Sequence, residues 1–197
     1  MAGRPRVGVL ALQGDVREHL AMLQGLGADA RPVRTRAQLD DVAGLVLPGG
    51  ESSVIDRLAR ILGVRDAIVE RIAEGMPVYG TCAGLILLAD KILDAAPGQT
   101  SFGGLDAVVR RNAFGSQVDS FEADLDVPVL GAPPVRAVFI RAPVVERVGE
   151  RATALADVGG RVVAIEQGPL LGTSFHPEVQ GEERFHRRFL DRVDGLA

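Results

Sequence analysis

One segment of the sequence has the residue types and spacing of a cysteine nucleophile. The run Gly80-Thr81-Cys82-Ala83-Gly84 follows a short apolar segment and opens another. It matches the G-x-nucleophile-x-G turn between a strand and a helix, with cysteine in place of serine. Cys82 would then lie at a helix N-terminus, where the helix dipole favours a thiolate, and the Ala83 N–H could bind a developing oxyanion. The alternative is that Cys82 is a small buried apolar residue.

A thiol nucleophile needs a base, and the chain has three histidines. His176 lies in Ser174-Phe175-His176-Pro177-Glu178, directly after an apolar segment, and sites gather at strand ends in α/β sheets. Glu178, two positions further on, can project to the same side of an extended chain and orient the imidazole. The H-P-E run alone is weak evidence for a functional site, but it supplies the base that the cysteine turn lacks. His19 and His186 have charged neighbours in expected helices, and we expect both to face solvent.

A glycine-rich segment follows another expected strand. It reads Leu47-Pro48-Gly49-Gly50-Glu51-Ser52-Ser53, and successive glycines allow backbone N–H groups to point outward, as an oxyanion hole or a carboxylate site requires. The alternative is an ordinary glycine turn capped by Ser52 or Ser53. No Gly-Lys-Ser/Thr follows, so the segment is not a Walker phosphate loop.

The elements that would position these residues alternate in the first half of the chain. Short apolar runs at 7–12, 28–33, 44–47 and 77–79 predict buried strands. Helical patterns separate them: one that Asp15 could cap and Gly27 ends, then 53–62, 64–74 and a strongly apolar one at 83–92. Strand–helix alternation of this kind predicts an α/β protein with a doubly wound, mostly parallel sheet.

The second half predicts strands instead, at 105–110, 121–127, 135–140, 162–167 and 170–174. The last two form an expected hairpin around Gly168-Pro169, so an antiparallel portion should join the sheet. A closing helix over 182–193 places Phe185, Phe189 and Val193 on one stripe, which indicates core packing. Since the sequence shows no repeat and no linker, we expect a single domain over residues 1–197.

Composition excludes several classes of protein. A length of 197 residues suits one domain with its own core. A single cysteine excludes a disulfide framework and a multi-thiolate metal site. A formal charge of −4, with acidic residues interspersed among the arginines, argues against a nucleic-acid partner. No run approaches the roughly 20 apolar residues of a membrane span, and no signal peptide is evident, so we expect a cytoplasmic protein.

Taken together, the motifs resemble those of the triad class of glutamine amidotransferases. Within that class the sequence is similar to the glutaminase subunit of pyridoxal 5'-phosphate synthase. The turn around Cys82 and the H-P-E run are shared across the class, whereas two other segments are particular to this subunit. The resemblance is carried by residues 8–14, 47–52, 80–84, 111–122, 138–143 and 174–178. It implies a flavodoxin-like class I glutamine amidotransferase fold.

The resemblance also implies a mechanism and a set of site residues. Cys82 would attack the side-chain amide of glutamine, His176 would transfer protons, and Glu178 would orient His176. No metal and no cofactor are implied, and the role of Gln13 in the first motif stays open. Backbone amides of Ala83, Gly49 and Gly50 would form the oxyanion hole, and glutamine would be held by Gly50, Glu51, Ser52, Arg111, Ile140 (through its backbone) and Arg141.

The implied partner is a (β/α)8-barrel synthase subunit that builds pyridoxal 5'-phosphate from ribose 5-phosphate and glyceraldehyde 3-phosphate. The two subunits would form a hetero-oligomer, and the lone glutaminase is expected to be weakly active. Three other interpretations stay open at this point: a glutaminase serving another pathway, a cysteine-turn hydrolase or stress protein of similar fold, and a catalytically silent subunit that keeps the fold.

Overall fold

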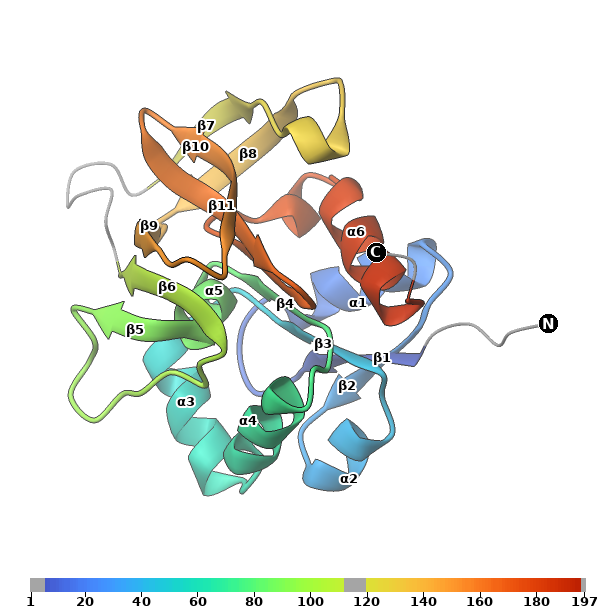
Figure 1. Ribbon diagram of the computed structural model, residues 1–197. Coiled ribbons are helices and arrows are strands. Elements are labelled where there is room, and N and C mark those ends of the chain that lie inside the picture. Colours follow the sequence, from blue (N-terminus) through green and yellow to red (C-terminus); the bar gives the residue numbers. More distant parts are fainter. Residues whose placement is uncertain (1–5, 112–119, 196–197) are drawn as a thin grey trace.

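A curled mixed sheet forms the centre of the molecule, as the computed structural model shows for residues 6–111 and 120–195 (Figure 1). Within those residues ten strands join in the order β2-β1-β3-β4-β12-β11-β9-β6-β5, and β10 pairs with β11. The parallel part consists of β1 (Arg6–Leu10), β2 (Asp29–Val33), β3 (Gly44–Leu47), β4 (Val78–Thr81) and β12 (Leu170–Thr173).

The central parallel strands are apolar along their whole length because both of their faces are covered. Every residue of β3, β4 and β12 is buried. This is the pattern of a parallel sheet with helices on both sides, where strands read as continuous apolar runs rather than alternating ones. The strands predicted at 7–12, 28–33, 44–47 and 77–79 are therefore confirmed, with their ends moved by a few residues.

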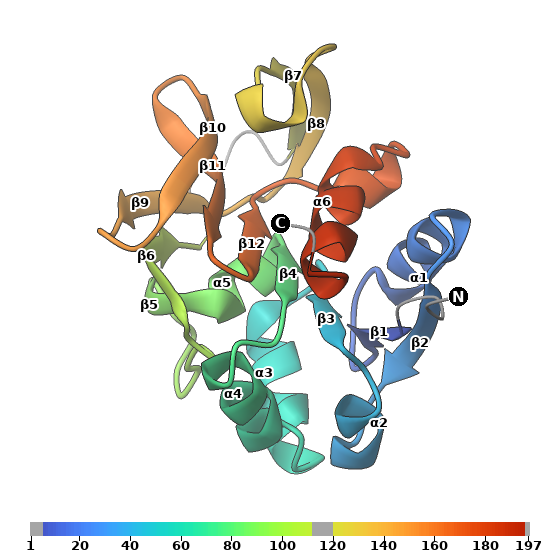
Figure 2. The same ribbon diagram turned by 45° about the vertical axis from the view of Figure 1, so that its right-hand side comes forward.

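Helices cover the two faces of this sheet (Figure 2). On one face lie α1 (Val16–Gly25) and α6 (Arg184–Val193), and on the other lie α3 (Ser52–Ile61), α4 (Arg65–Ala73) and α5 (Ala83–Leu88). Each face has its own apolar cluster, one built around Leu47, Ile68 and Leu85 and the other around Tyr79, Phe185 and Phe189. The prediction of a doubly wound α/β fold is confirmed.

The antiparallel portion is also present. The strand β11 (Arg161–Gln167) runs antiparallel to β12, to β9 (Val144–Val148) and to β10 (Thr153–Val158). The β11–β12 pair is the expected hairpin, with Ile165 opposite Gly172. Beyond β9 the sheet continues with β6 (Leu105–Arg110) and ends at β5 (Ala89–Leu93). A separate antiparallel pair consists of β7 (Ser120–Leu125) and β8 (Val135–Ile140), and short helical turns are α2 (Arg36–Asp40), η1 (Pro128–Leu130) and η2 (Pro177–Val179).

One predicted element is wrong in part. The helix expected over 83–92 ends at Leu88, and the chain continues directly as the edge strand β5. That strand pairs in parallel with β6, so a contact with a later segment decides its conformation and overrides the local apolar pattern. The strands β9 and β10 and the short helix α2 were not predicted. In the part of the chain that the structure describes, no helix has the length and apolar character needed to cross a membrane.

Candidate active site

The turn that carries Cys82 is a sharp connection between β4 and α5. Cys82 is the residue between Thr81, which ends the strand, and Ala83, which begins the helix. Its φ of 48° is one that non-glycine residues rarely adopt, as at the strained turn of a nucleophile elbow. A Cβ at Gly84 would overlap the carbonyl oxygen of Leu47, and one at Gly80 would overlap the backbone of Gly84. Both glycines are therefore needed for the strand and helix to approach this closely.

The sheet itself brings the H-P-E segment to this turn. The strands β4 and β12 are parallel neighbours, with Thr81 opposite Thr173, and the Cys82 N–H donates to the Thr173 carbonyl at 2.7 Å. The chain leaves β12 beside Cys82 and reaches His176 three residues later. Because the carboxyl ends of parallel neighbours share one sheet edge, residues far apart in sequence meet there.

Two carboxylates approach the same nitrogen of His176. The Nδ1 atom lies 2.9 Å from Glu178 Oε1 and 3.2 Å from Asp15 Oδ2. The Glu178 side chain is fully buried, whereas that of Asp15 is 38% exposed. Since carboxylates only accept hydrogen bonds, this arrangement selects the tautomer with the proton on Nδ1 and leaves Nε2 to act as a base.

Charge favours a protonated His176. Burial lowers the pKa of this imidazole, but Asp15, Cys82 and Glu178 outweigh burial and raise the pKa from 6.5 to about 12. Burial raises the pKa of Glu178, and its hydrogen bond with His176 offsets part of that rise. The site is thus built to hold an imidazolium between a sulfur and buried carboxylate oxygen.

Backbone groups of the glycine-rich segment pack against the imidazole. A Cβ at Gly49 would overlap His176 Cε1, and the Gly49 carbonyl accepts a hydrogen bond from the Asp15 N–H at 3.1 Å. Gly50 has a φ of 149° and packs against the side chain of Gln13. On the other side, Ala83 is the first residue of α5, so its N–H has no carbonyl within the helix to donate to.

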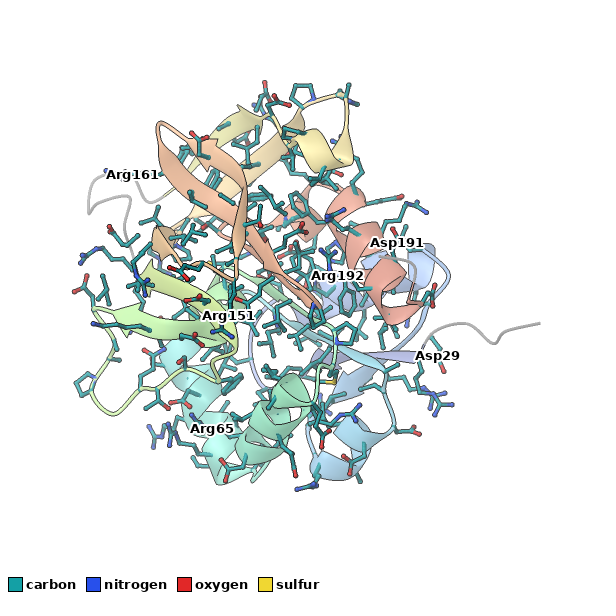
Figure 3. All side chains as sticks on the ribbon, in the orientation of Figure 1. Asp29, Arg65, Arg151, Arg161, Asp191 and Arg192 are labelled. Atoms are coloured by element: carbon teal, nitrogen blue, oxygen red, sulfur yellow. The ribbon has the colours of Figure 1, made fainter. Side chains whose placement is uncertain are left out.

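A cavity of about 320 Å³ opens in front of Cys82 and His176. Glu178, Gly49 and Ala83 do not line it, and Glu178 is covered from solvent. A larger cavity, about 490 Å³, lies at the opposite ends of β4 and β12, near Arg151 (Figure 3), and none of the described residues that line it is a cysteine, a histidine or a carboxylate. The smaller cavity is lined by Gln13, Asp15, Gly50, Glu51, Ser52, Cys82, Ile86, Arg111, Ile140, Arg141 and His176.

The cavity wall is held together by a network of side chains that starts at Arg111. This guanidinium donates to Glu51 Oε1 at 2.8 Å and to Gln99 Oε1 at 2.9 Å. Gln99 in turn donates to Ser52 Oγ at 2.9 Å. Glu51 is the N-cap of α3 and accepts from the Ser53 N–H, so Ser52 and Ser53 do not provide the cap that the alternative interpretation of this segment required.

On the facing wall, Ile140 ends β8 and Arg141 follows it. Ile140 is 42% exposed, and Arg141 has a φ of 42°, so the chain turns sharply there. The structure thus brings the expected substrate-binding residues to one cavity. The segment 112–119, which contributes to the sequence resemblance, lies outside the described residues.

Sequence reasoning missed several residues around the site. Gln13 is more than an ordinary turn residue, since its Oε1 accepts from the Glu51 N–H at 2.7 Å. Asp15 occupies the N-cap position of α1, but its side chain makes no cap hydrogen bond and lies at His176 instead. Gln99 gave no motif signal at all.

The expectation that His19 and His186 face solvent is wrong. Both side chains are fully buried, in α1 and α6 respectively. Helical spacing could have indicated this, because His19 lies four residues before the buried Leu23, and His186 lies three residues before the buried Phe189. Their charged neighbours in sequence point elsewhere on each helix.

Asp15, His176 and Glu178 also have the composition of a metal site, with ligand atoms within 4.8 Å of one another. The His176 Nδ1 atom is already engaged with both carboxylates. Hydrogen bonding and charge within the cluster therefore account for the arrangement without an ion.

A strained cysteine turn, a buried imidazole–carboxylate pair and a polar cavity thus lie together at one edge of the α/β sheet. The chain belongs to the SNO glutamine amidotransferase family, which it matches over residues 9–194. The predicted class and fold are thereby confirmed.

Individual relatives within and beyond this family are also similar to the chain. The chain is 66% identical to pyridoxal 5'-phosphate synthase subunit PdxT of Leifsonia xyli subsp. xyli, over 99% of each chain. It is 58% identical to the protein of the same name from Streptomyces coelicolor, over 98% of this chain and 96% of the relative. A crystal structure of a glutamine amidotransferase superposes with a TM-score of 0.89 at 48% identity, covering 95% of this chain and 98% of the other. A putative GMP synthase component from Thermoplasma acidophilum, 19% identical with a TM-score of 0.70, covers 99% of this chain and 96% of its own and shares the fold.

Proposed function

We propose that Cys82, His176 and Glu178 form a catalytic triad that hydrolyses L-glutamine to L-glutamate and ammonia through a thioester. The observation that carries the proposal is the hydrogen bond of 2.9 Å between His176 Nδ1 and Glu178 Oε1, formed beside the strained turn of Cys82. It leaves the second ring nitrogen of His176 for proton transfer with the thiol.

The reaction then divides into two steps that share one base. Cys82 gives its proton to His176 and its sulfur attacks the side-chain amide carbon of glutamine. His176 returns the proton to the departing nitrogen, so ammonia leaves and a thioester remains. His176 next takes a proton from water, whose oxygen attacks the thioester carbon. The carbon–sulfur bond breaks, glutamate leaves, and His176 returns the proton to the Cys82 sulfur. Glu178 stabilises the imidazolium that forms in both steps.

The oxyanion formed in each step needs backbone donors. Ala83 supplies a free helix N-terminal N–H next to the nucleophile, and Gly49 and Gly50 supply the facing turn. A donor of this kind contributes about 3–4 kcal/mol to transition-state stabilisation in comparable enzymes.

The charged wall of the cavity suits the α-ammonium and α-carboxylate of glutamine. Arg111 and Arg141 offer planar donors for the carboxylate, and Glu51 offers an acceptor for the ammonium. Because Arg111 already donates to Glu51, substrate would enter an existing ion pair rather than two bare charges. Gly50, Ser52 and the backbone of Ile140 complete the proposed substrate site.

The ammonia serves vitamin B6 synthesis, since the relatives with 56–66% identity are named as subunits of pyridoxal 5'-phosphate synthase. The partner is accordingly a synthase subunit, which we propose to be a (β/α)8 barrel bound in a cytoplasmic hetero-oligomer. An ammonia-transfer assay with each candidate acceptor enzyme distinguishes this function from that of a glutaminase serving another pathway.

Replacing the nucleophile tests the triad. Cys82→Ala should abolish ammonia release from glutamine, because no other cysteine exists in the chain, while the folded state survives the loss of one small side chain. Ammonia production and circular dichroism measure the two effects. Turnover near the wild-type rate in Cys82→Ala would rule out the thioester route.

Adding the partner tests the pathway. We expect glutamine hydrolysis by the purified chain to be slow and to rise when the synthase subunit is added, with ammonia appearing in pyridoxal 5'-phosphate. The measurement is the glutaminase rate against synthase concentration. An unchanged rate, or a full rate without synthase, would contradict coupling between the two subunits.

A further inference from the structure

Behind the triad lies a row of buried imidazoles that the proposed mechanism does not use. His19 Nδ1 lies 2.8 Å from His186 Nε2, and His19 Nε2 lies 3.1 Å from Thr81 Oγ1. The same His19 Nε2 atom is 3.6 Å from Glu178 Oε1, the oxygen that accepts from His176. The two imidazoles therefore connect α6 through α1 to Glu178 and to Thr81, the residue before Cys82.

The hydrogen-bond partners of His19 and His186 favour one tautomer of each imidazole. A proton on His19 Nε2 directs a donor at the Thr81 oxygen and towards the Glu178 carboxylate, whereas the other tautomer would direct a lone pair at that anion. His19 Nδ1 must then accept from His186 Nε2–H. His186 Nδ1 has no hydrogen-bond partner among the described residues.

Both histidines are neutral in this arrangement. Burial lowers the pKa of His19 well below 6.5, and His186 and His176 lower it further. Burial lowers the pKa of His186 to about 4 despite the nearby Glu182. The other titratable groups around the row are Asp15, Tyr79, Cys82, His176, Glu178 and Glu182.

Glu178 has few other partners to fix its carboxylate. Its Oε1 accepts from His176, and its Oε2 has no hydrogen-bond partner in the described part of the chain. His19 is thus the second polar group against this buried carboxylate, and it also holds the hydroxyl of Thr81, the residue directly before Cys82.

We propose that His19 is a positioning residue for Glu178 and Thr81, and that His186 fixes the tautomer in which it acts. This inference rests on the triad proposed above. At 3.6 Å the His19 Nε2–H is not hydrogen-bonded to Glu178, but its dipole is directed at the carboxylate and helps to orient it while His176 carries its extra proton. Loss of that N–H should weaken the imidazolium without changing the cavity where glutamine binds.

Two substitutions of nearly equal size separate this role from packing. His19→Gln keeps an N–H near the position of the imidazole Nε2, and His19→Met fills a similar volume without a donor. We expect His19→Met to lower kcat about 10- to 100-fold, by analogy with residues that hydrogen-bond the histidine ligands of metal sites, with KM unchanged. His19→Gln should keep kcat close to that of the wild type. Arg17→Gln, on the same helix with a side chain 93% exposed, is the control.

A second readout follows the thiol directly. Alkylation of Cys82 by iodoacetamide, measured at several pH values, should be slower in His19→Met than in the wild type and unchanged in His19→Gln, since a weaker imidazolium activates the sulfur less. Both assays use the full chain, and glutamine hydrolysis is measured with the synthase subunit present.

The outcomes separate this inference from the triad itself. Equal kcat values and equal alkylation profiles in the two His19 variants would overturn the positioning role, even where both variants melt at a lower temperature. Should His19→Met not fold, His186→Met takes its place, and a wild-type kcat there overturns the inference. Activity that survives in Cys82→Ala refutes the triad instead, independently of His19.

Discussion

At the scale of single residues, the competition for His176 Nδ1 decides which carboxylate completes the triad. Glu178 is closer, at 2.9 Å against 3.2 Å for Asp15, and it is fully buried where Asp15 is 38% exposed. Asp15 contributes at least as much as Glu178 to the raised pKa of His176, but water screens its exposed carboxylate and discounts that contribution. Glu178 therefore orients the ring, and Asp15 adds negative charge at its edge.

This ranking predicts different losses for two conservative substitutions. Glu178→Gln should lower kcat by about 10⁴-fold, as when a triad carboxylate becomes an amide and the wrong tautomer forms. Asp15→Asn should lower kcat less than about tenfold, because Asp15 mainly raises the pKa of His176. Steady-state kinetics at several pH values measure both. If Asp15→Asn costs as much as Glu178→Gln, then Asp15 is the third member of the triad.

At the scale of elements, the segment between β5 and β6 supports the cavity wall. Asp56 of α3 is buried and accepts from the Thr100 N–H at 3.1 Å, and Arg65 of α4 donates to the Ser101 carbonyl at 2.7 Å. These contacts hold Gln99 where it joins Arg111 to Ser52. A helix on one side of the sheet thereby fixes side chains of the proposed substrate site.

Removing this link should affect binding more than chemistry. Gln99→Leu leaves Arg111 and Ser52 without a shared partner, so we expect KM for glutamine to rise about tenfold with kcat nearly unchanged. Thr100→Val is the matched control in the same segment, since it keeps the backbone contact with Asp56 and loses only hydroxyl contacts with Arg60 and Arg65. A KM that rises equally in Thr100→Val would mean that the whole segment, not Gln99, sets the affinity.

Elements encoded by local patterns were predictable, and those decided by distant contacts were not. The central strands, the cysteine turn and the H-P-E segment follow from apolar runs and short motifs. The edge strand β5 does not, because Ala89–Leu93 continues an apolar helix in sequence and only its pairing with β6 makes it extended. Gln99 and Asp15 were missed for the same reason, since their partners lie on other elements.

At the scale of the whole molecule, the site depends on helices from both ends of the chain. The helices α1 and α6 pack on one face of the sheet and meet through the contact of 2.8 Å between His19 and His186. The proposed triad lies where β4 and β12, from the two halves of the sequence, become neighbours. The contact between the same two helices should make the fold sensitive to acid.

The unfolded chain binds protons on these two histidines more readily than the folded one. Since the pKa of His186 falls from 6.5 to about 4 on burial, stability should decrease as the pH falls below about 6.5 and continue to fall towards 4. At pH 5 the contribution of His186 alone corresponds to a loss of about 2 kcal/mol. The raised pKa of His176 has the opposite effect on stability. Its contribution to the free energy of unfolding is complete below pH 6.5 and is lost only as the pH rises towards 12.

The substitution His186→Met removes this contribution and, because His186 also lowers the pKa of His19, part of the His19 contribution in the same direction. Urea unfolding at pH 7.5 and pH 5 gives the free energy of unfolding of each. We expect the wild type to lose about 2 kcal/mol more than His186→Met between the two pH values. Equal losses would mean that His186 accepts its proton in the folded state, and that the contact between α1 and α6 tolerates a charged imidazole.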